Sequence, residues 1–179
     1  MALQGTDALS ALVNVAPACV QATLGVLAAN GQLGLEGSAL WLGSTSDLRV
    51  QTVVVPAGPG VSFEPKRVQL SVQWMDALGA VCDELGQVVL AGVHSHPWTA
   101  FHSEVDNDGF LHAPDFVSIV VPRYGVTDLA EADSEWAVYV GLPNGRWRAS
   151  SWSIAVELDP SARFETRVVT VGGLTDART

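Results

Sequence analysis

The residues best suited to chemistry lie in one short segment of this 179-residue chain. Residues 91–106 read AGVHSHPWTAFHSEVD and contain three of the four histidines. His94 and His96 are separated by a single residue, and on a β-strand residues i and i+2 point to the same face. Their imidazoles would then stand side by side and could bind one metal ion at about 2.0–2.1 Å each.

A third ligand is available a few residues further on. The sequence S-E-V-D predicts a helical turn, in which Ser103 and Asp106 are three residues apart and share a face. A catalytic zinc site has three protein ligands and one open position. We therefore predict His94, His96 and Asp106 as the metal ligands, with zinc as the ion.

Each part of this segment also has a simpler interpretation. A lone H-x-H is more often accidental than metal-binding, and S-x-x-D is also a helix-capping pattern with Ser103 as N-cap. Capping does not conflict with metal binding, and the combination directly after a predicted buried strand favours a metal site. We place His102 outside the ligand set and expect His112 to be solvated or structural.

Composition and charge limit the class of protein. Hydrophobic residues make up 48% of the chain and charged residues 16%, which argues against disorder. The formal net charge is -10 and the basic residues are scattered, so neither nucleic acid nor an anionic membrane surface is an expected partner. We find no signal-peptide pattern and no apolar run long enough to cross a bilayer, and we expect a cytoplasmic protein.

The two cysteines give no sign of a disulfide or a zinc knuckle. Cys19 and Cys82 lie far apart and neither belongs to a C-x-x-C motif. Cys82 falls in an apolar periodic stretch that is typical of a core.

Hydrophobic periodicity predicts a mixture of strands and two substantial helices. Pro17 suits the first turn of a helix that stops at Asn30-Gly31, and residues 68–85 have amphipathic helix spacing that ends at Gly86. Strands are predicted at 11–15, 35–44, 49–56, 61–63, 87–95, 116–122 and 164–171, with a hairpin of 135–141 and 145–154 and a frayed end at 172–179. The order predicts a single α/β (α+β) domain over residues 1–179, with a mixed sheet flanked by two main helices.

The segment His94-Ser95-His96-Pro97, followed by Ser103 and Asp106, resembles the metal-binding motif of the JAB1/MPN/Mov34 (JAMM) metalloenzymes. The loop between His96 and Ser103 is one residue shorter than in the common eukaryotic pattern, and the form A-F-H-S-x-x-D looks like bacterial members. The resemblance covers about residues 11–142 and implies an MPN/JAB-like (cytidine-deaminase-like) fold. The C-terminal strands, within 146–171, match no motif.

The resemblance also implies a glutamate that acts as general base. The candidates are Glu36, Glu64 and Glu84, and Glu36 is favoured because it opens the predicted strand 35–44 directly after the first helix, as in the family. Without the resemblance, an exposed charge at a strand start is the preferred interpretation of Glu36. Ser103 is expected to help hold the oxyanion, with no covalent intermediate and no role for a cysteine nucleophile.

By resemblance, the expected activity is a zinc-dependent isopeptidase or peptidase that cleaves after the C-terminus of a bacterial ubiquitin-like protein, in deconjugation or precursor processing. Operons that encode E1-like and E2-like enzymes, several of them antiphage systems, are the expected context. One alternative is a peptidase that releases cysteine or a small adduct from a ubiquitin-like sulfur carrier, and another is a non-catalytic MPN scaffold. Trp98 and Phe101 flank the ligand loop and would either contact substrate or pack the loop down.

Overall fold

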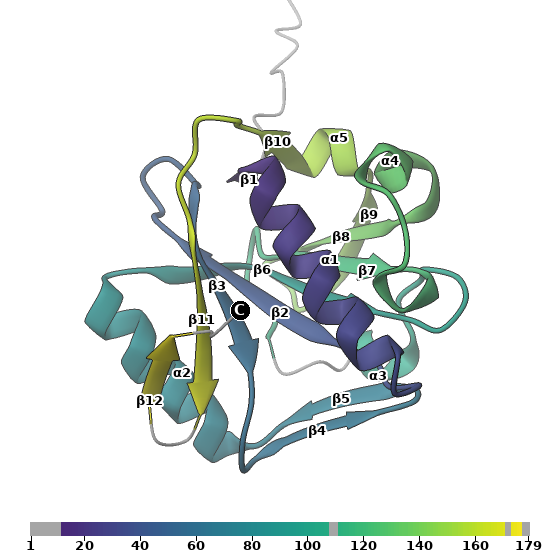
Figure 1. Cartoon of the computed structure of the whole chain (residues 1–179). Coiled ribbons are helices and arrows are strands. Elements are labelled where there is room, and N and C mark those ends of the chain that lie inside the picture. The colour runs from purple at the N-terminus through teal and green to yellow at the C-terminus, as the bar shows by residue number, and fades with distance from the viewer. Residues whose placement is uncertain (1–11, 108–110, 171–172, 177–179) are drawn as a thin grey trace, which may run out of the picture.

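The structure, a computed structural model, describes residues 12–107, 111–170 and 173–176 (Figure 1). Its main feature is a mixed sheet of eight strands in the order β12-β11-β3-β2-β6-β7-β8-β9. In chain order the elements are β1 (Val13–Val15), α1 (Pro17–Gly31), β2 (Ser38–Gly43), β3 (Val50–Pro56), β4 (Val61–Glu64), β5 (Arg67–Leu70), α2 (Val72–Leu85), β6 (Val88–Ser95), α3 (Glu104–Asn107), β7 (Val117–Val121), the 3-10 turns η1 (Arg123–Gly125) and η2 (Leu129–Glu131), α4 (Ala132–Glu135), β8 (Ala137–Gly141), β9 (Trp147–Ser150), α5 (Trp152–Ala155), β10 (Val156–Leu158), β11 (Glu165–Thr170) and β12 (Gly173–Asp176).

The pairing of strands explains where the ligand segment must lie. β6 is antiparallel to β2 but parallel to β7, with His94 opposite Val120. Parallel neighbours cannot be joined by a tight turn, so the chain needs a long crossover between them. Residues 96–116 form that crossover and carry α3, so the end of β6 and the α3 turn are brought back together.

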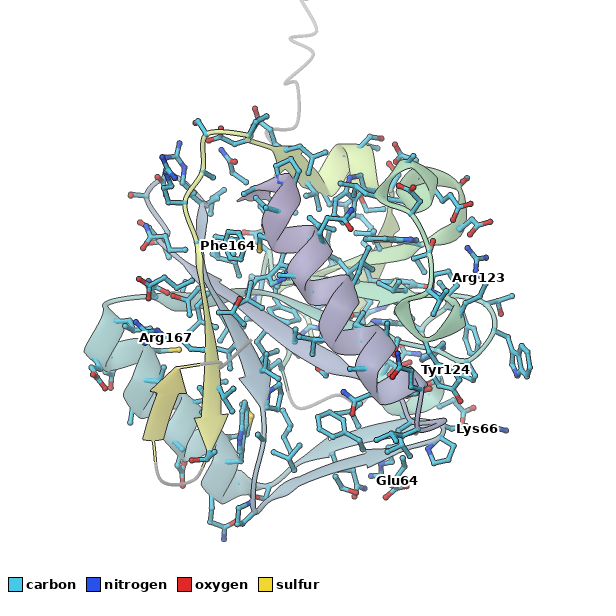
Figure 2. All side chains as sticks on the ribbon, viewed as in Figure 1. Glu64, Lys66, Arg123, Tyr124, Phe164 and Arg167 are labelled. Atoms are coloured by element: carbon cyan, nitrogen blue, oxygen red, sulfur yellow. The ribbon has the colours of Figure 1, made fainter. Side chains whose placement is uncertain are left out.

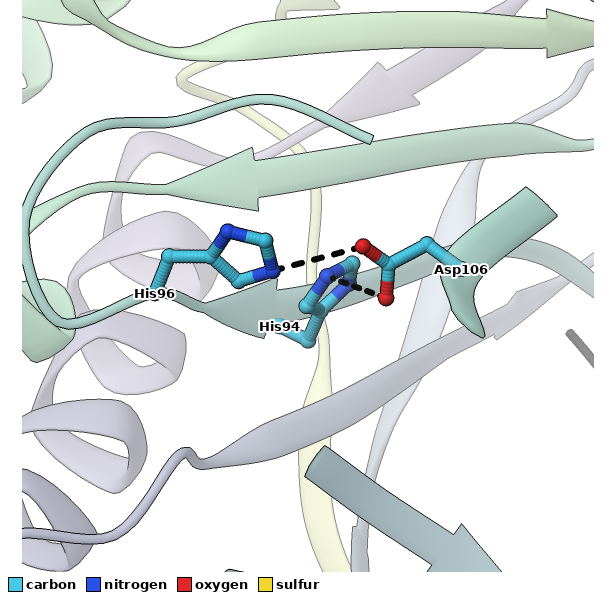
Figure 3. Close-up of side chains that lie close together, drawn as sticks. All are labelled: His94, His96 and Asp106. Atoms are coloured by element: carbon cyan, nitrogen blue, oxygen red, sulfur yellow. Dashed lines mark ion pairs between the residues drawn. The ribbon is translucent and has the colours of Figure 1, made fainter. Parts of the chain in front are cut away.

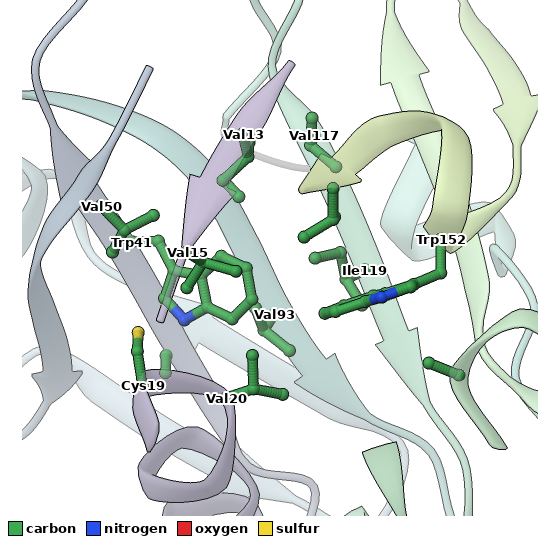
Figure 4. Close-up of a cluster of buried hydrophobic side chains, with 14 of the residues drawn as sticks. Val13, Val15, Cys19, Val20, Trp41, Val50, Val93, Val117, Ile119 and Trp152 are labelled. Carbon is green, nitrogen blue, oxygen red and sulfur yellow. The ribbon is translucent and has the colours of Figure 1, made fainter. Parts of the chain in front are cut away.

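Alternate side chains of β2 point to opposite faces of the sheet and belong to two separate cores, one on each face. Trp41 is fully buried on the face covered by α1, where Cys19 and Val20 pack against it (Figure 4). The Trp41 indole Nε1 donates to Thr23 Oγ1 at 2.9 Å, and its ring meets Trp152 edge-on at 6.5 Å. Cys82, by contrast, is only partly buried and packs against the core on the other face.

The second helix covers part of the opposite face. Ser71 caps α2 by accepting from the Trp74 amide, and Gly86 ends it with a left-handed φ of 62°. Trp74 packs against Leu40 in the second core, and its indole donates to the Val169 carbonyl at 3.0 Å. The sheet is thus flanked by α1 and α2, as predicted. None of the helices in the described part of the chain has the length and apolarity needed to span a membrane.

Several predicted boundaries are wrong. The predicted helix 68–85 begins only at Val72, because residues 67–70 pair with β4 as a strand and Ser71 caps the helix. The predicted strand 35–44 begins at Ser38, and the strand predicted over 145–154 ends at Ser150, where α5 follows. The end predicted as frayed contains β12. Ala11 and Val171, the outer residues of two predicted strands, lie outside the described residues, and the extent of the domain stays a prediction.

Candidate metal centre

The three predicted ligands converge at one point in the structure (Figure 3). The Nε2 atom of His94 lies 3.1 Å from Asp106 Oδ1, and the Nε2 atom of His96 lies 3.3 Å from Asp106 Oδ2. The ligand atoms of all three residues lie within 4.8 Å of one another. Their role as ligands stays a prediction, but the sequence has brought two nitrogens and a carboxylate to a single centre.

Two observations show that this centre fits a metal ion. Around a tetrahedral zinc with bonds of about 2.0–2.1 Å, neighbouring ligand atoms lie roughly 3.3 Å apart, which is close to the distances found here. In addition, His94 Nε2 is buried and makes no hydrogen bond. A buried nitrogen without a hydrogen bond is unfavourable unless another group, such as a cation, occupies its lone pair.

The two histidines are held by the backbone on both sides. His94 lies opposite Ser38 in the pairing of β6 with β2. The His96 amide donates to the Val121 carbonyl at 2.9 Å, and the His96 carbonyl accepts from the Tyr124 amide at 2.8 Å. Tyr124 has a left-handed φ of 55°, which costs a non-glycine residue about 1–3 kcal/mol. The chain accepts this strain directly beside a predicted ligand.

Ser103 holds the carboxylate of Asp106. Its amide and its hydroxyl each donate to Asp106 Oδ2 at 2.7 Å, and the Asp106 amide donates back to Ser103 Oγ at 3.2 Å. Burial alone would raise the pKa of Asp106, but the two imidazoles and the Ser103 hydroxyl hold that pKa well below its usual range. Asp106 is therefore ionised throughout the physiological pH range, as a metal ligand must be.

Glu36 lies beside this centre and is 3% exposed. Its Oε1 atom is 3.9 Å from His96 Nε2. Burial raises the pKa of Glu36 from 4.5 to about 7, with the charge of Asp106 raising it further and that of His96 lowering it. The other two candidates, Glu64 and Glu84, are exposed. The structure thus brings only Glu36, of the three, to the cluster.

The segment before β2 fixes the position of Glu36. This residue lies outside the strand that it was predicted to open, and its amide donates to the Glu64 carbonyl at 2.9 Å. The next amide, that of Gly37, donates to the buried Ser95 hydroxyl at 2.9 Å, while the Ser95 amide donates to the Gly37 carbonyl at 3.0 Å. The residue between the two histidines therefore ties the Glu36 segment to β6.

The two predicted substrate contacts lie at the rim of the centre. The Phe101 ring meets the His96 imidazole edge-on at 4.9 Å and is 50% exposed. The Trp98 side chain is 79% exposed, and its backbone carbonyl accepts from the Arg123 amide at 3.3 Å. Phe101 thus packs on a predicted ligand, and substrate binding by both residues stays a prediction.

The other two histidines lie outside the ligand cluster. His112 Nε2 is within 3.2 Å of the Arg146 carbonyl, and its ring meets Trp147 edge-on at 4.5 Å. His102 is more deeply placed, with its ring stacked on Tyr139 at 3.9 Å. The sequence patterns gave no sign of this stacking, because it joins residues that are far apart in the chain.

Sequence patterns also missed a groove of about 660 Å³ that opens beside His94 and Asp106. On β6, the residue two positions before His94 is Gly92, whose missing side chain leaves space next to Phe116. A glycine inside a predicted strand was the available signal. We call this cavity the groove. The β4–β5 hairpin lines it with Gly60, Val61, Ser62, Arg67, Val68, Gln69, Leu70 and Ser71. The segments after β6 and the strand β9 contribute Val105, Leu111, Phe116, Ser118 and Trp147, and the strands β2 and β6 contribute Ser38, Leu40, Gly92 and Val93.

The raised pKa of Glu36 gives a test on the metal-free protein. Because the folded pKa of about 7 exceeds the ordinary 4.5, the carboxyl favours folding below pH 4.5, and this contribution is lost as the pH rises to about 7. At 1.36 kcal/mol per pH unit, the loss is about 3 kcal/mol at most. We expect Glu36→Gln to stabilise the metal-free protein at pH 8 and to have little effect at pH 4.5, as measured by urea unfolding with a chelator present. Glu64→Gln should change neither value, and an equal effect of Glu36→Gln at both pH values would contradict the burial argument.

Metal content tests the cluster itself. We expect the purified protein to carry about one equivalent of divalent metal, and His94→Ala and Asp106→Asn to carry almost none, because each change leaves only two of the three ligands. His112→Ala serves as the matched control and should retain the metal. Elemental analysis of the four proteins measures this, and near-zero metal in the unchanged protein even after growth with added zinc would argue for a scaffold without an ion.

No family model matches the chain. Two solved structures share its fold: a protein from Desulfitobacterium hafniense (19% identity, TM-score 0.53) and one from Salinibacter ruber (20% identity, TM-score 0.54), each covering 84% of this chain and 94% of the other. The probable metalloprotease y4jG of Sinorhizobium fredii (strain NBRC 101917 / NGR234) is 32% identical over 111 residues, or 59% of this chain and 68% of that protein. Its name implies a bound metal, in agreement with the cluster of His94, His96 and Asp106. The chain therefore belongs to the metalloprotease family that includes y4jG.

Proposed function

We propose that this chain is a zinc-dependent isopeptidase or peptidase of the JAMM type, which cleaves after the C-terminus of a bacterial ubiquitin-like protein. The observation that carries the proposal is the position of Glu36, buried next to three converging ligands. A carboxyl group that titrates near neutral pH can both accept and donate a proton under working conditions. In a metal-free scaffold, nothing would require a buried carboxylate at this place.

When bound, zinc supplies Lewis acidity, which polarises a carbonyl group and makes water acidic near neutral pH. His94, His96 and Asp106 would hold the ion, and Glu36 would take a proton from the attacking water. The same carboxyl would then protonate the leaving amine. No covalent intermediate is needed, in agreement with the burial of Cys19, whose pKa is raised to about 12 by desolvation.

Ser103 has two roles in this proposal. Its hydroxyl orients Asp106, as the hydrogen bond of 2.7 Å supports. The hydroxyl has a single proton, so to help hold the oxyanion of the substrate it would turn that proton away from Asp106 Oδ2, while the Ser103 amide keeps its own hydrogen bond to that oxygen. An oxyanion contact is typically worth about 10²–10³ in rate.

The groove supports an extended tail as the substrate. In the described part of the chain β5 pairs only with β4, so its other edge is open to the backbone of an added strand. The groove leads to His94 and has Gly92 beneath it, which suits the small residues at the end of a ubiquitin-like protein. We further propose that the fold is an MPN/JAB-like domain and that E1-like and E2-like enzymes form the conjugates on which it acts.

A panel of ubiquitin-like proteins fused through their C-termini to a reporter tests this function. We expect zinc-loaded protein to cut at least one fusion at the junction, and Glu36→Gln to slow cleavage by about 10²–10⁴ because it cannot accept a proton. Glu64→Gln is the matched control and should cleave normally. Chelation should abolish activity, and thiol alkylation should leave it intact.

The possible outcomes separate the alternatives. Equal cleavage by Glu36→Gln and the unchanged protein would refute the role of Glu36. Release of only a small C-terminal adduct, with no fusion cleaved, would favour action on a sulfur carrier. Intact fusions and adducts together with one bound zinc would refute the proposed substrate class.

A further inference from the structure

Two permanently charged side chains, Arg67 and Asp106, are found among the described residues that line the groove. Among the described residues that line it, Arg67 is the only one with a permanent positive charge, and Asp106 is the only carboxylate. The oxygens of Asp106 already face His94, His96 and Ser103. Arg67 is therefore the charged group that remains for a side chain of the substrate.

Arg67 has a polar neighbour but no counter-ion. In the orientation that satisfies both groups, the Gln69 amide oxygen lies 2.6–2.8 Å from the three guanidinium nitrogens. Glu64 lies opposite Arg67 in the hairpin, yet Arg67 forms no ion pair within the part of the chain that the structure describes. Apolar walls beside an unneutralised charge concentrate its field. The part of the groove beside Arg67 therefore carries a positive charge without an ion-pair partner among the described residues, in a protein whose net charge is -10.

Backbone pairing gives the approximate distance between the backbones of Arg67 and Glu36, the residue that lies beside the cluster. The Glu36 amide bonds to the Glu64 carbonyl, and Glu64 pairs with Arg67. Two strand spacings of about 4.8 Å therefore separate the backbones of Glu36 and Arg67. An extended chain covers this distance of about 10 Å in about three residues.

We propose that Arg67 selects tails with an acidic side chain about three residues before the scissile bond and rejects tails with a basic one there. The inference rests on the proposed function, since it concerns the tail of the same substrate. The apolar groove walls, such as Leu70 and Phe116, would take the neighbouring apolar side chains of that tail.

Binding of product-like peptides tests this without any cleavage. Eight-residue peptides that end in Gly-Gly and carry Glu, Ala or Arg at the third residue from the end would be titrated into zinc-loaded protein, with fluorescence anisotropy as the readout. We expect the Glu peptide to bind about fivefold more tightly than the Arg peptide. Arg67→Glu should reverse that order.

Lys66→Glu is the matched control. Lys66 lies next to Arg67 in the chain but projects from the turn of the hairpin and does not line the groove (Figure 2). Lys66→Glu changes the net charge by the same amount as Arg67→Glu, and it should leave the order of the peptide affinities unchanged.

Three results would overturn the inference: an unchanged order with Arg67→Glu, an equal reversal with Lys66→Glu, or no binding of any peptide. If peptides bind in the expected order but no fusion is cut, the groove inference stands and the proposed reaction fails. If fusions are cut and all three peptides bind equally, only the selection by Arg67 fails.

A second and independent observation concerns His102. Its amide donates to Tyr139 Oη at 3.1 Å, and its Nε2 lies 2.8 Å from Ser118 Oγ. Its Nδ1 lies 3.2 Å from Asn107 Oδ1, at the other end of the α3 turn. His102 therefore joins both ends of the turn that carries Asp106 to the neighbouring strands β7 and β8.

We infer that His102 is a positioning residue for the metal ligand Asp106. The ligand turn has only four helical residues, which is too short to be stable by itself. Ser103 orients the carboxylate within the turn, whereas His102 connects the turn to the neighbouring strands β7 and β8, in addition to the bond from Trp147 Nε1 to the Asn107 carbonyl. Residues that orient ligands in this way typically change metal affinity by about 10–100-fold when they are replaced.

Metal affinity, compared with the stability of the metal-free protein, separates positioning from simple packing. We expect His102→Ala to weaken zinc binding at least about tenfold in competition with a chromophoric chelator. Ser118→Ala removes only the Nε2 contact, so it should weaken binding less while keeping the fold. His112→Ala is the control, because His112 also contacts Trp147 but makes no hydrogen bond or ring contact with the α3 turn in the described part of the chain.

A merely structural role predicts a different pattern. His102→Ala would then lower the midpoint of urea unfolding of the metal-free protein and leave the zinc affinity of the folded fraction unchanged. That pattern would overturn the inference. If His102→Ala does not fold, Ser118→Ala decides, and zinc affinity equal to that of the unchanged protein would refute positioning.

Discussion

The parallel pairing of β6 with β7 is the constraint on which the centre depends. Two parallel neighbours force the chain to leave the sheet and return, and the excursion over residues 96–116 carries Asp106 back to the histidines that end β6. The sheet thus supplies the first predicted ligand, His94, from β6 and the second, His96, from the residue that directly follows this strand, and the crossover supplies the third. Because the strand register is fixed by burial on both faces, the distance between these ligands is set by the core.

A second connection brings Glu36, the predicted general base, to the same place. Ser95 lies between the two histidines and points away from them, where it binds the Gly37 backbone through its hydroxyl and its amide. Because side chains alternate along an extended chain, His94 and His96 face the cluster, whereas Ser95 faces the Glu36 segment and holds it in place. The segment His94-Ser95-His96 therefore contributes two side chains to the cluster and also attaches the Glu36 segment to β6.

The sequence predicted the features that depend on short-range periodicity. The i and i+2 histidines, the S-x-x-D turn, both flanking helices and most strands follow from spacing within one element. Glu36 could be chosen only through a family resemblance, since no local pattern links it to His96 across 60 positions of the chain. The hairpin strand β5 was taken for helix because Leu70 fits the apolar spacing of α2. The contacts of His102 with Ser118 and Tyr139 could not be predicted because they join residues far apart in the chain.

The proximity of the buried Glu36 to the partly buried Asp106 also bears on the stability of the chain. Carboxylates that are largely shielded from water repel each other, and a divalent cation held between them and the histidines would relieve that repulsion only in the folded state. Chains without the ion would then unfold more often and be degraded more readily in the cell. The abundance of the protein would then follow the supply of that ion.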